Sequence, residues 1–131
     1  MQIVFSRRFE QIEKIYIIPL TIYSTNENNS QECKALIDTG ADASMINRET
    51  AKKLHLKKIG ESQRNTANGS YIADEYLVSI EFSSGFVIDN LKVVSVDFEY
   101  ADFIIGTDIL SRGTLTISNL FGKTDIRFWT Y

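Results

Sequence analysis

Asp38, Thr39 and Gly40 follow one another directly, and a carboxylate, a hydroxyl and a glycine in this order could do chemistry. The apolar residues Ala35-Leu36-Ile37 come immediately before them and are typical of a buried strand. Asp38 is therefore expected where burial ends, and a carboxylate in such a place either accepts several hydrogen bonds or takes part in a reaction. Taken alone, the tripeptide favours a turn or a helix cap over catalysis.

A second stretch farther along the chain has a similar design. Phe103-Ile104-Ile105 predicts another buried strand, which runs into Gly106. Thr107 and Asp108 follow, and either side chain can cap a short helix that begins with the next apolar residues. The chain thus contains two apolar strands that each end beside a glycine, a hydroxyl and a carboxylate.

Together these stretches resemble the motifs of the retropepsin-like aspartic proteases, the single-lobed relatives of retroviral protease. The first family motif matches Asp38 to Asp42 together with Ser44 and Ile46, and the second matches Ile104 to Leu110. Thr66-Ala67-Asn68-Gly69 stands where the family places its flap, a hairpin that closes over the substrate. The resemblance implies a mainly β fold, a single-lobed, closed or partly open antiparallel β-barrel with one or two short helices.

The resemblance also implies a role for each motif residue. Asp38 would activate water, Thr39 would hydrogen-bond across a two-fold axis, and the Gly40 carbonyl would accept a hydrogen bond from the substrate. Ala41 would lie in the wall of a substrate pocket, and Asp42 would contact the substrate main chain. Two further sets complete the expected site: the substrate-binding flap residues Ala67, Asn68 and Gly69, and the residues that support the catalytic loop, Ile105, Gly106 and Asp108.

Peptide hydrolysis by carboxylates needs two such groups a few ångströms apart that share one proton, one acting as base and the other as acid. This chain contains a single Asp-Thr-Gly. The second carboxylate is therefore expected from a second copy, in a homodimer with both Asp38 residues at its two-fold axis. The implied activity is that of an aspartic endopeptidase on extended protein or peptide substrates, with no cofactor and no covalent intermediate.

Two other interpretations stay open. On the same fold, the chain could be a peptide-binding or dimerisation module with weak or no catalysis, because fold alone does not decide activity. A monomeric hydrolase could instead pair Asp38 with an internal carboxylate such as Asp42 or Asp108. A metal site is not expected, because His55 is a lone histidine with no cluster of further ligands nearby.

The chain has 131 residues and a formal net charge of -3. This length predicts one domain, residues 1–131, with a core from 15 to 128 and an N-terminal arm from 1 to 14.

The scattered basic residues argue against nucleic-acid binding, and no apolar run reaches the roughly 18 to 20 residues of a membrane span. The N-terminus lacks the pattern of a secretory signal, so a cytoplasmic location is expected. The single Cys33 excludes an internal disulfide and favours a small packed side chain.

β-branched and aromatic residues predict a largely antiparallel sheet. Short helices are expected over 47–54, with Asn47 as the N-cap, and over 109–112. Pro19 places its strand at an edge or a bulge, Asn68-Gly69 is a hairpin signal, and Asp89-Asn90 marks a bend or a bulge. The predicted strands are 15–23, 32–37, 71–73, 76–82, 86–88, 91–96, 115–117 and 124–128, with turns at 24–31 and 83–85.

Both ends of the chain leave alternatives. The first fourteen residues could form a strand, a turn of helix or an arm exchanged between the copies of a dimer. The aromatic C-terminus, Arg127 to Tyr131, could join an intermolecular sheet or pack on its own core.

Overall fold

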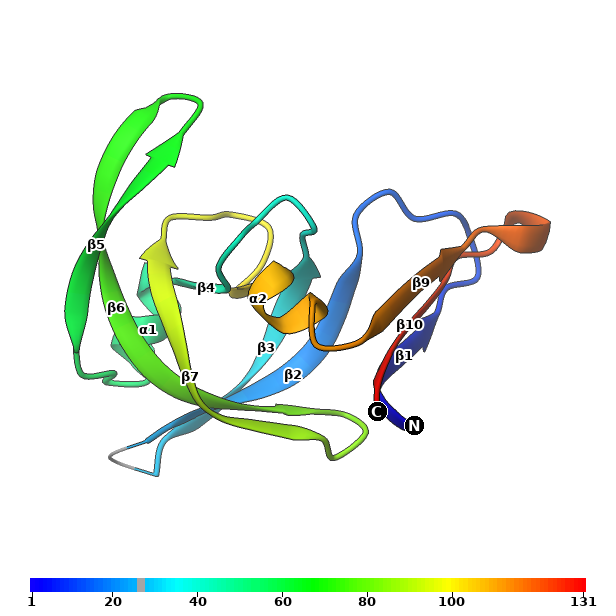
Figure 1. The fold of residues 1–131 in the computed structure, drawn as a ribbon, viewed down its shortest axis with the longest axis horizontal. Coiled ribbons are helices and arrows are strands. Elements are labelled where there is room, and N and C mark those ends of the chain that lie inside the picture. The colour runs from blue at the N-terminus through cyan, green and yellow to red at the C-terminus, as the bar shows by residue number, and fades with distance from the viewer. Residues whose placement is uncertain (26–27) are drawn as a thin grey trace.

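Two β-sheets and three short helical segments form the fold of residues 1–25 and 28–131, the part of the chain that the computed structural model describes. The two sheets stand side by side in Figure 1. The helical segments are α1 (Arg48–Lys53), α2 (Thr107–Leu110) and η1 (Leu120–Gly122). The strands are β1 (Gln2–Arg8), β2 (Ile17–Ser24), β3 (Ser30–Ile37), β4 (Met45–Asn47), β5 (Gly60–Thr66), β6 (Gly69–Phe82), β7 (Val87–Val96), β8 (Phe103–Ile105), β9 (Thr114–Ser118) and β10 (Asp125–Thr130).

The larger sheet closes on itself. Its strand order is β2-β3-β8-β4-β7-β6-β5, and a further pairing of β2 with β6 joins the first six of these strands into a barrel. Neighbouring strands are antiparallel except for β3 with β8 and β4 with β7, which are parallel. The structure therefore confirms the predicted mainly β, single-lobed barrel and adds two parallel pairings to it.

The alternation of side chains explains how the barrel wall delivers Asp38. β2 and β3 both alternate buried side chains with more exposed ones, and Leu20 lies opposite Cys33 on the buried face. Ile37 is the last buried side chain of β3, and Asp38 follows it directly. The apolar pattern that builds the core thus ends at the acidic residue, as the sequence predicts.

β1, β10 and β9 form the smaller sheet, in that order, and the two chain ends lie next to each other (Figure 1). Phe5 on β1 fastens this terminal sheet to the barrel. Its ring centroid lies 5.7 Å from that of Phe82 on β6 and 5.4 Å from that of Phe128 on β10. Aromatic pairs at such distances add about 0.5–1.5 kcal/mol to the stabilisation from buried area. β1 and β9 are the edge strands of this sheet.

Both predicted helices are present, and the second both begins and ends two residues earlier than expected, over 107–110 instead of 109–112. Asn47 is the N-cap of α1, because its side chain accepts a hydrogen bond from the Glu49 backbone N–H. α2 begins at Thr107, two residues before the predicted start. The reason is that the Gly106 carbonyl accepts hydrogen bonds from the N–H groups of Ile109 and Leu110, so the helix starts directly after the glycine.

The polar strand β5 is absent from the predicted strands. None of its side chains is buried, so no apolar alternation marks it, yet it pairs with β6 along its whole length. β4, with three residues, is also missing from the prediction. β6 runs unbroken through the two strands predicted at 71–73 and 76–82. Residues 26 and 27 of the predicted turn at 24–31 lie outside the described residues.

The predicted irregularities of the strands are confirmed. Asp89 and Asn90 on β7 lie opposite the single residue Ser79 on β6, and Asn90 has a φ of 53°, which makes a bulge. Gly85 closes the turn after β6 with a φ of 88°. Pro19 lies on the part of β2 that pairs only with β3, where its missing N–H leaves no ladder bond unmade.

Of the alternatives for the first fourteen residues, the structure contains the strand, β1. β1 pairs with β10 of the same chain, and Phe128 is buried against Phe5 of the same chain. The C-terminal segment therefore packs on its own core. Cys33 is buried within β3, as a small packed side chain. Across the described residues, none of the helices has the length and apolar character that crossing a bilayer requires.

Candidate active site

Asp38 occupies the loop that leaves the C-terminal end of β3, and its side chain is half-buried. The Asp38 N–H donates to the Ile105 carbonyl at 3.0 Å, so β8 holds this end of the loop. The Gly40 N–H donates to Asp38 Oδ1 at 2.9 Å. A Cβ atom on Gly40 would lie 3.2 Å from the same oxygen, so a side chain there would crowd the carboxylate. The loop therefore fixes one oxygen of Asp38, while Oδ2 has no hydrogen bond within the described chain.

Gly106 lies against the other side of this loop. A Cβ atom on Gly106 would come within 2.8 Å of the Ala41 carbonyl oxygen and within 2.9 Å of the Ala43 carbonyl group. Both obstacles are backbone, which cannot rotate aside as a side chain can. The second motif therefore needs a glycine at this position so that β8 and the loop 38–44 can approach each other.

Asp108 and Ser44 join the two motifs. The Ser44 N–H donates to Asp108 Oδ2 at 3.0 Å, and the Ser44 hydroxyl donates to Oδ1 at 2.7 Å. The same hydroxyl accepts from the Gly106 N–H at 3.1 Å, and the Ile109 N–H donates to Asp108 Oδ1 at 3.0 Å. Both oxygens of Asp108 are thus used to hold the loop 38–44 against α2, which makes this carboxylate a structural group.

The exposed part of the loop contains Thr39 and Gly40. The Thr39 hydroxyl has no hydrogen-bond partner among the residues that the structure describes. Ala41 is buried, and its carbonyl oxygen accepts from the N–H of Thr107 at 2.8 Å and from its hydroxyl at 3.2 Å. The loop is therefore anchored behind Ala41 and presents Thr39 and Gly40 at the surface.

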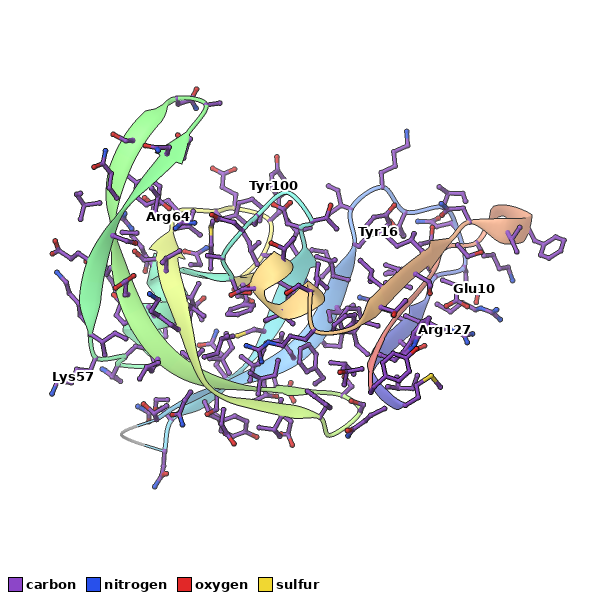
Figure 2. All side chains as sticks on the ribbon, in the orientation of Figure 1. Glu10, Tyr16, Lys57, Arg64, Tyr100 and Arg127 are labelled. Atoms are coloured by element: carbon purple, nitrogen blue, oxygen red, sulfur yellow. The ribbon has the colours of Figure 1, made fainter. Side chains whose placement is uncertain are left out.

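Asp42 ends this loop segment with an exposed side chain. Its Oδ1 accepts a hydrogen bond from Arg64 Nη2 at 2.6 Å, and the two groups form an ion pair. Arg64 lies on β5, so it is the hairpin that supplies the partner of Asp42 (Figure 2). The sequence analysis missed Arg64, because a lone arginine in a polar segment has no distinguishing pattern. Its position four residues before the predicted hairpin turn at Asn68-Gly69 is the one available signal.

A hollow of about 440 Å³ lies beside Asp38. Phe98 and Tyr100, from the segment between β7 and β8, form an edge-to-face pair with ring centroids 5.6 Å apart and contribute to its wall. Ile117 of β9 also lines the hollow. The sequence analysis missed this aromatic pair, although two aromatic residues in an otherwise polar loop just before the second motif are a usable signal. The remaining lining residues are Lys14, Ile15, Tyr16, Leu36, Ile37 and Thr39.

The hairpin of β5 and β6 projects from the barrel wall (Figure 1). Its tip contains the predicted flap residues Ala67, Asn68 and Gly69, and all three are exposed. Gly69 has a φ of 123°, a backbone conformation that side chains rarely allow. The Thr66 hydroxyl accepts from the Asn68 N–H at 3.3 Å and donates to the Gly69 carbonyl at 2.9 Å, which closes the turn.

The described residues contain no group of three or more His, Cys, Asp or Glu side chains arranged to hold a metal ion. His55 follows α1 with a φ of 53°, and its N–H donates to the Lys52 carbonyl, so it ends that helix. Two larger hollows, of about 610 and 870 Å³, lie on the terminal sheet and between β1 and β2. Asp38 lines neither of them.

A closed barrel with an aspartate loop at the end of β3 and a projecting β5–β6 hairpin is the architecture of the retropepsin-like aspartic proteases, and solved structures share this fold. The retropepsin-like aspartic protease from Rickettsia conorii is 20% identical, with a TM-score of 0.63 over 95% of this chain and 91% of that one. The EIAV protease in complex with the inhibitor HBY-793 is 23% identical, with a TM-score of 0.61 over 79% of this chain and 91% of that one. The retroviral protease-like domain of Ddi1 from Leishmania major is 21% identical, with a TM-score of 0.55 over 90% and 96%.

The sequence itself identifies the family. A family model described as "gag-polyprotein putative aspartyl protease" matches residues 25–112, a span that contains both motifs and the hairpin. The chain therefore belongs to this family of aspartyl proteases, as the motifs predict. Among curated proteins, none matches the sequence.

Proposed function

We propose that this chain is an aspartic endopeptidase whose active site forms between two copies, with Asp38 of each copy at a two-fold axis. The observation that carries the proposal is the fixed, half-buried carboxylate of Asp38 in a loop whose next residues, Thr39 and Gly40, are exposed. Ala41 is held by Thr107, while Thr39 and Gly40 are exposed, so the loop can contact the same loop of a second copy.

In the proposed reaction, the two Asp38 carboxyl groups share one proton. The ionised one takes a proton from water as the oxygen attacks the peptide carbonyl carbon, and the other donates its proton to the carbonyl oxygen. Collapse of the tetrahedral intermediate then breaks the C–N bond, and a proton passes to the leaving amine. The products are a carboxylic acid and an amine, with no covalent enzyme intermediate.

The internal carboxylates support a second copy as the source of the missing group. Both carboxylate oxygens of Asp108 accept hydrogen bonds, from Ser44 and Ile109, and Asp42 forms an ion pair with Arg64. Asp108 therefore has no oxygen left to share a proton with Asp38, and one oxygen of Asp42 is held by Arg64, which argues against the monomeric interpretation. The unpartnered Thr39 hydroxyl is available for a hydrogen bond across the axis.

The terminal sheet offers an edge for the same contact. β9 is an edge strand, and its Ile117 lines the hollow beside Asp38. An unpaired edge exposes N–H and carbonyl groups that can pair with another strand. We infer that β9 of two copies pairs antiparallel across the axis, while β1 stays with β10 of its own chain.

The β5–β6 hairpin would act as the flap. Ala67, Asn68 and Gly69 at its tip would cover an extended peptide and exclude water, which strengthens each polar contact beneath them. Gly40 and Ala41 would line the opposite side of the peptide, with the Gly40 carbonyl accepting a substrate N–H and Asp42 contacting the substrate main chain.

The test is cleavage of an unfolded protein substrate and a peptide library between about pH 4 and 7, with the wild-type chain and Asp38→Asn. We expect cleavage by the wild-type protein and at least a 1,000-fold loss in the variant, with the circular dichroism spectrum unchanged. Retained cleavage by Asp38→Asn would overturn the proposal. Binding of extended peptides by the wild-type protein without any turnover would favour the alternative, a peptide-binding module.

A further inference from the structure

Arg64 lies on the face of the hairpin that is turned toward the barrel. Along β5, the side chains of Ser62 and Arg64 are partly covered, whereas Glu61, Gln63 and Asn65 are exposed. Side chains alternate between the faces of a strand, so Arg64 belongs to the underside of the hairpin. Its cross-strand neighbour there is Tyr71.

The Arg64 side chain bridges the hairpin and the catalytic loop. Its guanidinium donates to Asp42 Oδ1 at 2.6 Å, and Asp42 follows Asp38 by four residues. Within the described chain, this is the one side-chain hydrogen bond or ion pair that joins β5 or β6 to the loop 38–44. Other side-chain contacts of the hairpin, such as that of the Tyr71 hydroxyl with the Ser95 carbonyl, reach the barrel wall instead.

The two partners differ in exposure, and this difference suggests their roles. The Arg64 side chain is 23% exposed, whereas that of Asp42 is 84% exposed. Arg64 is therefore held by its surroundings, whereas Asp42 is exposed and its second oxygen, Oδ2, accepts no hydrogen bond within the described chain. A carboxylate can keep one charge-assisted hydrogen bond while its other oxygen accepts a backbone N–H.

We propose that Arg64 is a positioning residue, which orients Asp42 so that Oδ2 accepts a backbone N–H of an extended peptide. This inference rests on the proposed function, in which Asp42 contacts the substrate main chain. It adds that the flap strand itself sets the direction of that contact, so flap position and peptide grip are coupled. Because Arg64 does not touch the scissile bond, its loss should weaken binding and leave bond cleavage nearly unchanged.

The experiment compares Arg64→Gln, Arg64→Lys, Asp42→Asn and the double variant Arg64→Gln/Asp42→Asn. For Arg64→Gln we expect KM to rise about tenfold with kcat within about twofold of wild type. Arg64→Lys should recover part of the loss, because it restores the charge without the planar geometry. The double variant should be no worse than Asp42→Asn. Lys123→Gln, which removes the 3.0 Å ion pair between Lys123, just before β10, and Glu10, just after β1, is the matched control.

A second readout does not depend on turnover. With Asp38 intact, calorimetry with pepstatin, a probe that binds without being cleaved, should give an affinity about tenfold weaker after Arg64→Gln. Cleavage with an unchanged KM, equal pepstatin affinities, or additive effects in the double variant would overturn the role of Arg64 and leave the proposed function intact. Absence of both cleavage and pepstatin binding in the wild-type dimer would overturn both proposals.

Discussion

Asp108 accepts a hydrogen bond from the Ser44 hydroxyl at 2.7 Å, across 64 positions of sequence. This contact joins the second motif to the loop of the first, because the same hydroxyl also accepts from the Gly106 N–H. Ser44 and Gly106 are buried and Asp108 is half-buried, so the three groups satisfy one another largely away from water. The loop that presents Asp38 is therefore held by a buried polar network as well as by apolar packing.

Ser44→Ala should lower the free energy of unfolding by about 2 kcal/mol, because the Gly106 N–H loses its acceptor inside the protein. Urea denaturation measures the change. Ser111→Ala is the control, since Ser111 is exposed at the end of α2 and should stay within about 0.5 kcal/mol of wild type. Equal effects of the two substitutions would show that the network does not stabilise the loop.

Gly106→Ala should destabilise the protein by at least about 2 kcal/mol, since its new methyl group would meet the backbone of Ala41 and Ala43. Gly60→Ala is a matched control with a similar close approach of 2.7 Å, there to a Glu75 carboxylate oxygen. That side chain can swing away, so we expect a change within about 0.5 kcal/mol. Thermal unfolding measures the stability of both variants. A Gly106→Ala protein as stable as wild type would contradict the steric argument.

Much of the barrel could be predicted because its strands carry apolar alternation. Residues such as Ile18 and Ile37 are buried in strands that the pattern identifies. β5 was not predicted, because it is stabilised by pairing with β6. It buries none of its own side chains, so it has no apolar alternation in its sequence. The parallel pairing of β3 with β8 also cannot be read from either strand, since it depends on how distant segments meet.

The candidate site was likewise predicted only in part. Asp38, Gly106 and Asp108 could be predicted because each belongs to a short motif with a chemical requirement. Arg64 and Phe98 were missed, because they come from a polar strand and an irregular segment that the fold brings to the motif. A single chain sequence also contains no direct sign of which surface meets a second copy.

Cys33 should resist thiol reagents in the native protein. Burial, with a smaller effect of the Asp102 charge, raises the pKa of its thiol to about 12. At pH 8 the thiolate fraction is then on the order of 1,000-fold lower than for a free cysteine with a pKa of about 8.5. Reaction with a chromogenic disulfide should be slow in buffer and fast in urea; a fast native reaction would contradict the burial.

The same shift has a pH dependence with a definite sign. The folded protein keeps the Cys33 thiol neutral, whereas the unfolded chain ionises it above about pH 8.5. Its contribution to stability is therefore complete below pH 8.5 and decreases as the pH rises from there toward 12. Cys33→Ala should flatten the alkaline side of the stability profile, measured by urea unfolding between pH 7 and 10.

Phe121→Asn should raise the free energy of unfolding by about 0.5–1 kcal/mol. Phe121 is 97% exposed and has a φ of 58°, so it buries nothing in return for a strained backbone that asparagine tolerates better. Leu120→Asn removes a similarly exposed apolar side chain at a position without positive φ and should give no such gain. If the two substitutions changed the thermal stability equally, the gain would come from removing an exposed apolar side chain and not from relieving the backbone at Phe121.

The central claim is that two Asp38 carboxyl groups from two copies act together, and mixing tests it most directly. Wild-type protein is combined with increasing Asp38→Asn protein at constant total concentration, allowed to exchange subunits, and assayed for peptide cleavage. Random dimers with an inactive mixed form predict activity proportional to the square of the wild-type fraction. A linear fall would mean that each copy works alone and would contradict the shared active site.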